Sequence, residues 1–232
     1  MRHFLFTLAS CAALLGGPAV AQDNPVVVEL FTSQGCSSCP PADALLHDLA
    51  KREDVIALAL HVDYSDYIGW KDPFGDAAHA ERQRSYARAG QRRHIYTPEM
   101  IVNGTTDIVG AKSMKLAEAI LDHARQPKQV ALGLKREGDK LSLTASPLSQ
   151  LRGPLTVHLL RYTPKESTRI SRGENAGKTL TYANIVEGWT VLGEWDGAGP
   201  LEMSAQVSGD LPTVVIIQQD GTGPIVGAAR LR

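Results

Sequence analysis

The stretch from Val26 to Pro41 constrains the fold of this chain more than any other part of the sequence. Its first residues are apolar and largely β-branched, which predicts a buried strand, and Gln34-Gly35 predicts a turn. Cys36 and Cys39 come next. A helical pattern follows them, with an apolar face formed by Ala42, Leu45, Leu46 and Leu49. Strand, turn, cysteine pair and helix, in this order, are typical of a thiol–disulfide redox site.

The expected place of Cys36 in the first turn of this helix gives the pattern its chemistry. Unpaired backbone N–H groups and the helix dipole favour an anion there. A thiolate at such a position has its pKa lowered from about 8.5 into the range of about 3.5–7.5. Cys39 lies nearly one turn further on, so it is placed to attack a mixed disulfide formed at Cys36. Pro40 and Pro41 fit a first turn, because proline needs no helical partner there.

The first 21 residues have the pattern of a secretory signal peptide. Arg2 gives a positive start, Phe4 to Leu15 is apolar, and Ala19-Val20-Ala21 is a small-residue cleavage site. We therefore expect cleavage after Ala21 and a periplasmic or secreted protein. We expect no membrane span, because no other stretch approaches the roughly 18 apolar residues that one requires.

Removal of the signal peptide also removes Cys11, which leaves Cys36 and Cys39 as the cysteines of the mature chain. A bridge over so few residues adds little chain-entropy stabilisation. This favours a redox role over a purely structural bridge. The formal net charge of −1 shows neither a basic excess nor an acidic tail, so we expect no nucleic-acid partner.

Residues 25–126 predict a strand, a helix, a second strand, another helix, a hairpin and a last helix. The second strand is Val55 to Val62, which makes a parallel βαβ unit with the first. An arginine-rich helix spans about residues 75–93, with either a solvated face or a basic rim near the thiolate. Asn103-Gly104 predicts the turn of the hairpin. Ser113 is expected to cap the last helix.

This half resembles the thioredoxin-fold family, and the resemblance implies roles for five residues. Cys36 matches the nucleophilic cysteine and Cys39 the resolving cysteine. Thr97 and Pro98 match the loop with a cis-proline that faces the pair and offers backbone to substrates. Glu29 lies close to the position of a buried acid, which implies that it shuttles the proton of Cys39.

A closer resemblance joins the motif around Cys36 to three later segments. It is to a family of secreted bacterial thioredoxin-like proteins classed only as a domain of unknown function. The spacer Ser37-Ser38 differs from the Gly-Pro of true thioredoxins, so their reduction potential and partners are not carried over. The later segments are Gly69-Trp70-Lys71-Asp72-Pro73-Phe74, Tyr96-Thr97-Pro98 and Arg172-Gly173-Glu174-Asn175-Ala176-Gly177.

From Lys128 the pattern changes to short apolar runs and turns, without a convincing long helix. A hairpin is expected at residues 130–144, and further strands at 155–162, 201–207 and 214–226. The predicted fold is therefore an α/β thioredoxin-like domain over residues 22–127, followed by a smaller all-β, sandwich-like domain over residues 128–232.

Two polar or aromatic segments of the sequence leave alternatives open. The loop from Arg172 to Asn175 is either a turn with an internal ion pair or a binding loop. Tyr64, Tyr67 and Trp70 form either a lid over the active edge or the anchors of an irregular segment.

The function expected from the sequence is an exported thiol–disulfide oxidoreductase that exchanges the Cys36–Cys39 disulfide or dithiol with protein partners of the cell envelope. This thiol chemistry needs no cofactor. The alternative is a periplasmic copper chaperone with Cys36, Cys39 and His61 as ligands, or a non-catalytic binding module. A zinc site is disfavoured, because it needs two further ligands and no second cysteine pair exists.

Overall fold

The computed structural model describes residues 25–232 of the chain. The predicted signal peptide and its cleavage after Ala21 lie outside these residues. Up to position 124 the described chain alternates strands with helices. Its elements are β1 (Val26–Thr32), α1 (Pro40–Leu49), β2 (Val55–His61), the 3₁₀ turn η1 (Asp66–Ile68), α2 (Ala77–Ala89), β3 (Glu99–Val102), β4 (Thr106–Val109) and α3 (Ser113–Ala124).

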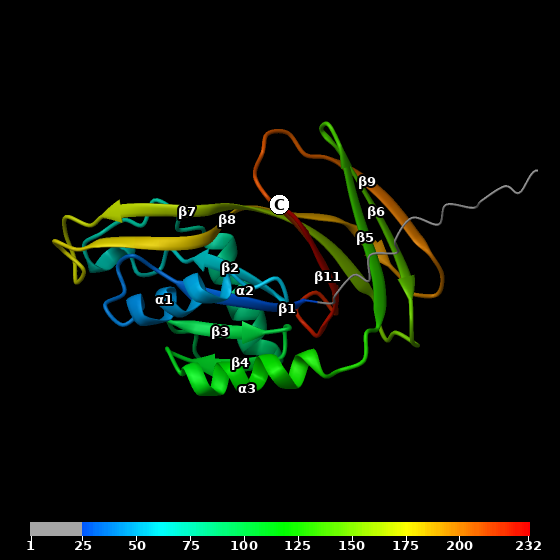
Figure 1. The fold of residues 1–232 in the computed structure, drawn as a ribbon. Coiled ribbons are helices and arrows are strands. Elements are labelled where there is room, and N and C mark those ends of the chain that lie inside the picture. Colours follow the sequence, from blue (N-terminus) through cyan, green and yellow to red (C-terminus); the bar gives the residue numbers. More distant parts are fainter. Residues whose placement is uncertain (1–24) are drawn as a thin grey trace, which may run out of the picture.

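From position 130 onward, every element of regular secondary structure in the described chain is a strand. Two of them, of 15 and 17 residues, form a long hairpin that extends past α1 at the left of Figure 1. These two strands are β7 and β8, and residues 170–178 between them are called the β7–β8 loop. The elements are β5 (Val130–Glu137), β6 (Lys140–Pro147), β7 (Leu155–Arg169), β8 (Thr179–Trp195), β9 (Leu201–Gln206), β10 (Thr213–Gln219) and β11 (Ile225–Leu231).

One mixed sheet of eight strands runs through both halves, in the order β11-β10-β7-β8-β2-β1-β3-β4. β1 pairs in parallel with β2 and antiparallel with β3, and β3 turns into β4 at Asn103-Gly104. The βαβ unit and the hairpin expected from the sequence are thus confirmed. β8 joins β2 in parallel through the pairing of Ala59 with Ile185, and Asn184 Nδ2 donates to the Ala57 carbonyl at 2.8 Å.

The two faces of β1 pack against different helices, because successive side chains of a strand point to opposite faces. Val26, Val28 and Leu30 share a core with side chains of α1 and α3. Val27 and Phe31 share a core with Tyr86 of α2. Every residue of β1 is buried, which agrees with the uninterrupted apolar run in the sequence. A residue's parity in β1 therefore decides whether it faces the α1 side or the α2 side.

The expected fold class is wrong, because residues 25–232 do not divide into a thioredoxin-like α/β domain and a separate all-β domain. Strand accounts for 43% and helix for 18% of the described residues. Four strands from after position 127 lie in the same sheet as β1 to β4. The sequence pattern stopped the strand after Tyr162, yet β7 continues to Arg169. This polar extension of β7 pairs with β8, and β8 in turn pairs with β2, so that the sheet is continuous between the two halves.

A smaller sheet of three strands, in the order β5-β6-β9, lies at the right of Figure 1. The hairpin of β5 and β6 is the one expected at residues 130–144. A third apolar core lies between this sheet and the far strands of the large sheet, with Leu141 and Leu143 packed among Val157, Val215 and Val226. The later strands thus form a two-layered end that shares its main sheet with the rest of the molecule.

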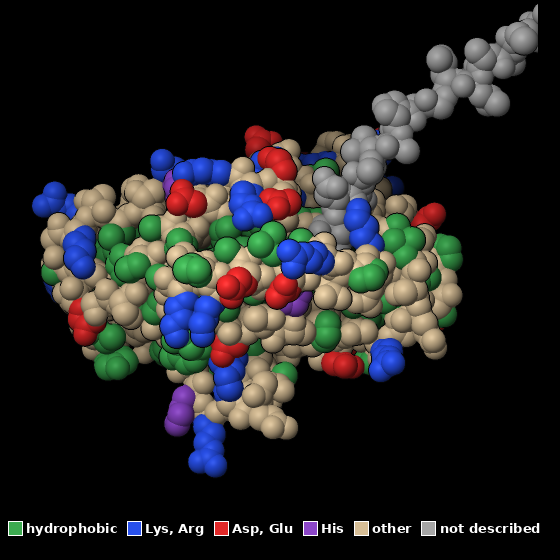
Figure 2. Space-filling model, turned by 60° about the horizontal axis from the view of Figure 1, so that its bottom comes forward, with side chains coloured by type: hydrophobic (Ala, Val, Ile, Leu, Met, Phe, Trp, Pro, Cys, Tyr) green, Lys and Arg blue, Asp and Glu red, His purple; other side chains and the backbone are tan. Residues whose placement is uncertain are grey.

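Charged side chains of both signs are interspersed over the face on the α3 side, which Figure 2 brings forward. Apolar side chains lie between them in small groups. Among residues 25–232, no helix combines the length and the apolar character needed to cross a membrane.

Candidate functional site

Cys36 and Cys39 form a disulfide, with their Cα atoms 5.4 Å apart. Cys39 is the N-cap residue of α1, and Cys36 lies in the turn that precedes the helix rather than inside its first turn. Cys39 is completely buried, whereas 7% of Cys36 is exposed. Cys36 is therefore the more accessible of the two cysteines.

The turn around the disulfide holds its own backbone in place. The amide of Cys36 donates to the Ser33 carbonyl at 3.1 Å, and the amide of Cys39 donates to the Cys36 carbonyl at 3.3 Å. The hydroxyl of Ser38 lies 3.3 Å from Cys36 Sγ. A hydroxyl at this distance can donate a hydrogen bond to a thiolate, which favours the ionised form of Cys36.

The peptide bond between Thr97 and Pro98 is cis. Phe31 of β1 lies opposite Glu99 of β3, so Pro98 lies beside the carboxyl end of β1, from which the cysteine turn continues. Pro98 is buried, its carbonyl accepts a bond from the Gly110 amide at 2.9 Å, and Thr97 is half-buried. The strand register thus brings Thr97 and Pro98 to the sheet edge that carries Cys36 and Cys39.

A polar cluster fixes the loop that contains this cis bond. Gln83 Nε2 donates to Glu99 Oε2 at 2.5 Å and to the Tyr96 carbonyl at 2.7 Å. Arg92 forms ion pairs with Glu99 at 2.5 Å and with Asp107 at 3.3 Å. Burial raises the pKa of Glu99, and the neighbouring Gln83 and Arg92 oppose that rise. The sequence left two roles open for the arginines of residues 75–93, a solvated face or a basic rim near the thiolate. Arg92 instead anchors this loop through its two ion pairs.

Glu29 is not brought to the disulfide. It lies on the α2 face of β1, whereas α1 covers the opposite face. Its carboxylate pairs with Arg82 (Nε to Oε1, 2.6 Å) and accepts a bond from Tyr86 OH at 2.5 Å. Arg82 also donates to Gln218 of β10 at 3.0 Å. These contacts tie β1, α2 and β10 together.

A buried acid that the sequence analysis did not single out does lie on the α1 face. Asp43 follows Cys39 by one helical turn, and its amide donates to the Cys39 carbonyl at 3.1 Å. Its Oδ1 accepts a bond from Thr32 Oγ1 at 2.8 Å. Burial raises the pKa of Asp43 to about 6, although the charge of His61 and the bond from Thr32 lower it. The signal in the sequence was an acid four residues after Cys39, on the same helical face.

His61 and Asp72 continue this polar group. His61 Nδ1 lies 2.7 Å from Asp72 Oδ2, and both side chains are fully buried. Asp72 also accepts bonds from the amides of Gln34 and Phe74, at 2.8 and 2.9 Å. A carboxyl group with three donors around it orients the imidazole ring through Nδ1 and leaves Nε2 facing away from Asp72.

Three buried polar atoms of this neighbourhood have no hydrogen-bond partner within the described chain: Asp43 Oδ2, His61 Nε2 and Tyr182 OH. The rings of His61 and Tyr182 have centroids 4.8 Å apart. Buried polar atoms are rarely left unpaired, and a catalytic or redox role is one of the explanations for an exception. Behind Cys39 the chain therefore places groups that can take up and release a proton.

In the segment between β2 and α2, Tyr64 and Trp70 are hydrogen-bonded to the rest of the molecule and Tyr67 is exposed. Trp70 Nε1 donates to Gln34 Oε1 at 2.9 Å, and Tyr64 OH donates to Gln83 Oε1 at 2.9 Å. Tyr67, by contrast, is 87% exposed. Tyr64 and Trp70 are anchors, and the exposed aromatic ring is that of Tyr67.

The β7–β8 loop reaches the cysteine turn. Asn175 Nδ2 donates to the carbonyls of Gln34 and Cys36, at 2.9 Å each. Glu174 Oε2 accepts a bond from the Ser37 amide at 3.3 Å. The loop that the sequence left open is thus part of the wall around the disulfide.

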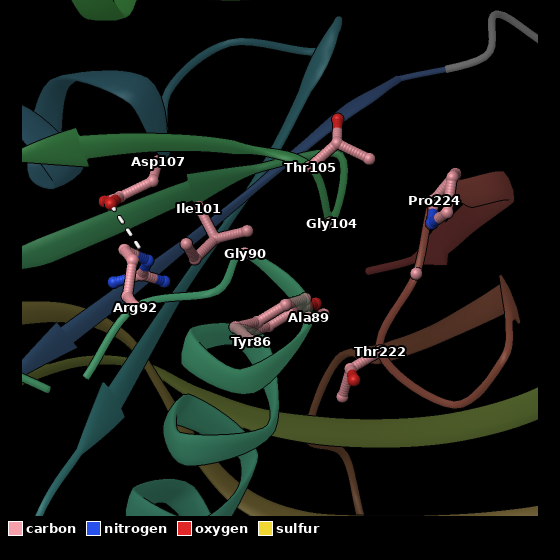
Figure 3. A pocket seen from close by; sticks show the side chains of 11 residues that line it. Tyr86, Ala89, Gly90, Arg92, Ile101, Gly104, Thr105, Asp107, Thr222 and Pro224 are labelled. Carbon is pink, nitrogen blue, oxygen red and sulfur yellow. Dashed lines mark ion pairs between the residues drawn. The ribbon is translucent and has the colours of Figure 1, made fainter. Parts of the chain in front are cut away.

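A separate hollow of about 260 Å³ lies between the end of α2, the β3–β4 turn and the segment before β11 (Figure 3). Its side chains include Tyr86, Thr222 and the Arg92–Asp107 ion pair, drawn as a dashed line in the figure. The β3–β4 turn lies beside Val27, near the start of β1. The part of this hollow at the β3–β4 turn is therefore remote from the disulfide, whereas its Arg92 also contacts Glu99 next to the cis-proline loop.

No group of three or more His, Cys, Asp and Glu side chains within residues 25–232 is arranged to hold a metal ion. His61 is engaged with Asp72 through Nδ1. The metal alternative built on Cys36, Cys39 and His61 gains no support from this geometry.

Comparisons with known proteins relate the chain to one family model and to solved structures. A family model described as a protein of unknown function (DUF1223) matches residues 27–218. A search of curated proteins gave no match. A crystal structure of a protein from Agrobacterium tumefaciens is similar, with a TM-score of 0.78, 32% identity, and coverage of 91% of this chain and 96% of that one. HBP35 of Porphyromonas gingivalis is similar in fold alone, with a TM-score of 0.55, 13% identity and coverage of 90% and 75%.

Proposed function

This chain belongs to the family of proteins of unknown function DUF1223, and we propose that it is an exported thiol–disulfide oxidoreductase whose redox pair is Cys36 and Cys39. The observation that carries the proposal is one sheet edge, where a disulfide at the start of α1 lies on the same side as the cis Thr97–Pro98 loop. The resemblance to thioredoxin-family proteins that we use here concerns these site residues and not the fold of the whole chain.

The proposed reaction is a pair of thiol–disulfide exchanges. In the reduced protein, the Cys36 thiolate attacks a partner's disulfide, forms an S–S bond with one partner sulfur and releases the other as a thiolate, which takes up a proton. Cys39 then loses its proton and attacks Cys36 Sγ. This restores the Cys36–Cys39 disulfide and leaves the partner as a dithiol. The reverse sequence oxidises a partner dithiol, and two electrons move in either case.

Cys39 needs a proton acceptor because it is completely buried. Asp43 is one turn away, and its pKa of about 6 lets its carboxylate exist at neutral pH while still binding a proton readily. We assign to Asp43 the role first expected of Glu29. His61, held by Asp72, stabilises the negative charge when Asp43 is ionised.

The partners in this proposal are protein thiols and disulfides of the cell envelope. The predicted signal peptide supports export. Thr97 and Pro98 would hold an extended segment of the partner beside Cys36, as in strand addition to a sheet edge. The exposed ring of Tyr67 lies on the segment next to the cysteine turn, where it can contact the same partner.

A trapping experiment with Cys39→Ala tests the proposal. If Cys36 is the attacking sulfur, this variant accumulates covalent adducts with envelope proteins, and a reducing agent releases them. Cys36→Ala is the matched control and forms none. Reduction of insulin disulfides by the wild-type protein gives a second readout. A Cys39→Ala protein that is exported and folded but forms no adducts, together with no insulin reduction, contradicts the proposal.

A further inference from the structure

Two adjacent residues of the β7–β8 loop hold the two sides of one peptide unit in the redox turn. Asn175 Nδ2 donates to the Cys36 carbonyl at 2.9 Å. Glu174 Oε2 accepts a bond from the Ser37 amide at 3.3 Å. The Cys36 carbonyl and the Ser37 amide belong to the same peptide bond. The orientation of that bond next to the reactive sulfur is therefore set by residues more than 130 positions away.

The loop itself is held firmly enough to act as a support. Asn175 is completely buried, and its Oδ1 accepts a bond from Lys178 Nζ at 2.9 Å. The Ile170 amide donates to the Lys178 carbonyl and the Gly177 amide to the Ile170 carbonyl, at 2.9 and 2.8 Å. Gly173 has a φ of +71°, and a Cβ there would lie 3.3 Å from Trp70 Cβ.

The charges of this loop bear on the ionisation of Cys36. A carboxylate near a thiol disfavours the thiolate, and an ammonium group favours it. Glu174 contacts the Ser37 amide directly. Lys178 is connected to the redox turn only through Asn175, to which its Nζ donates. Behind the disulfide, Asp43 and Asp72 are acids and His61 is a base. Glu174 is the group of this set that is exposed to solvent and contacts the redox turn directly.

We infer that the β7–β8 loop tunes the redox pair, with Glu174 raising the free energy of the Cys36 thiolate and Asn175 fixing the peptide bond beside it. This inference rests on the proposed function and deepens it. Stabilising the thiolate of a redox pair stabilises the reduced form and makes the disulfide a stronger oxidant. Glu174 therefore keeps the pair more reducing than it would otherwise be.

Equilibration with glutathione buffers tests this without any protein partner. Two glutathione thiols reduce the Cys36–Cys39 disulfide and become one glutathione disulfide. For Glu174→Gln we expect a shift of about 3- to 10-fold in this equilibrium toward the dithiol, where tenfold corresponds to about 30 mV. The pKa of Cys36, read from alkylation rate against pH, falls in parallel. The shift shrinks in 1 M salt, because an exposed charge is screened.

Lys178→Gln is the matched control of opposite sign and shifts the equilibrium toward the disulfide. Asn175→Ala removes the bond to the Cys36 carbonyl without adding a charge, and we expect it to change the rate of glutathione exchange. If Glu174→Gln leaves both the equilibrium and the Cys36 pKa unchanged, the tuning role is refuted, even in a protein that reduces insulin. If the variants shift the glutathione equilibrium but no protein disulfide is exchanged, the tuning stands and the proposed function fails.

Discussion

Thr32 Oγ1 donates a hydrogen bond to Asp43 Oδ1 at 2.8 Å and so joins the end of β1 to the first turns of α1, directly behind Cys39. The same β-strand carries Glu29, but that carboxylate points to the other face of the sheet and pairs with Arg82. Two buried acids near the start of the described chain thus have different surroundings: Asp43 lies one helical turn from Cys39, and Glu29 lies in an ion pair between elements.

The two acids are separated by measuring exchange and stability together. We expect Asp43→Asn to slow the resolution of a Cys36 mixed disulfide at pH 7 by about 100-fold, at the low end of general-base effects. Glu29→Gln leaves this rate unchanged and costs roughly 3–5 kcal/mol of stability, as for other broken buried pairs. Stopped-flow release of a thiol leaving group and urea unfolding give the two numbers. If Glu29→Gln slows the resolution step and Asp43→Asn does not, Glu29 and not Asp43 accepts the proton of Cys39.

Asp43 also predicts a pH-dependent stability. Its pKa rises from 3.8 in the unfolded chain to about 6 in the fold, so the folded state binds its proton more tightly. This contribution is present at low pH and is lost as the pH rises through about 6. Asp43→Asn should therefore be more stable than the wild type at pH 8 by up to roughly 3 kcal/mol. Urea unfolding at pH 4 and pH 8 measures this, and a difference that does not grow with pH argues against a buried carboxylate.

His158 predicts the opposite dependence. Burial and the charge of Arg82 lower its pKa from 6.5 to about 4, and its Nδ1 accepts a bond from Trp189 Nε1 at 3.0 Å. Because the unfolded chain binds this proton more tightly, the stability is present above pH 6.5 and is lost as the pH falls toward 4. We expect a loss of roughly 3 kcal/mol over that range, absent in His158→Gln. Unfolding curves at pH 7, 5.5 and 4.5 for both proteins check it; parallel curves contradict it.

Gly104 is expected to be intolerant of a side chain. Its φ is +73°, and a Cβ there would collide with the backbone carbonyl of Gly223, on the turn between β10 and β11. Gly110 is the matched control, with a φ of +66° and nothing within 4 Å of its Cβ position. Both alanine variants carry the strain of a positive φ, so Gly104→Ala should cost about 1–3 kcal/mol more than Gly110→Ala. Equal unfolding midpoints would show that the two turns are not in fixed contact.

The sequence is informative where its signals are local. The buried run before Cys36 predicted β1, the spacing after Cys39 predicted α1, and Asn103-Gly104 predicted the β3–β4 turn. Hydrophobic period and turn chemistry act over a few residues, so they can be read from the chain itself. The cis bond at Thr97–Pro98 was implied by the resemblance, and the structure has it.

The parts that were mispredicted or missed depend on partners far away in the chain. The polar end of β7 and the interrupted pattern of β8 are ordered by each other, and β8 is attached to β2 through Asn184 and Ala57, 127 residues apart. No local sequence pattern indicates such a pairing, so the sequence predicts a separate domain for the second half. Asn175 is a turn residue by sequence and becomes a support of Cys36 only through the fold.

By itself the sequence determined the cysteine pair, its strand and its helix, because these features follow from neighbouring residues. Only the tertiary structure decided which acid stands behind Cys39. β-strand parity sends Glu29 to one face and leaves Asp43 on the other. The burial that raises the pKa of Asp43 arises when β1, β2 and α1 close around it, and that closure is a property of the assembled sheet.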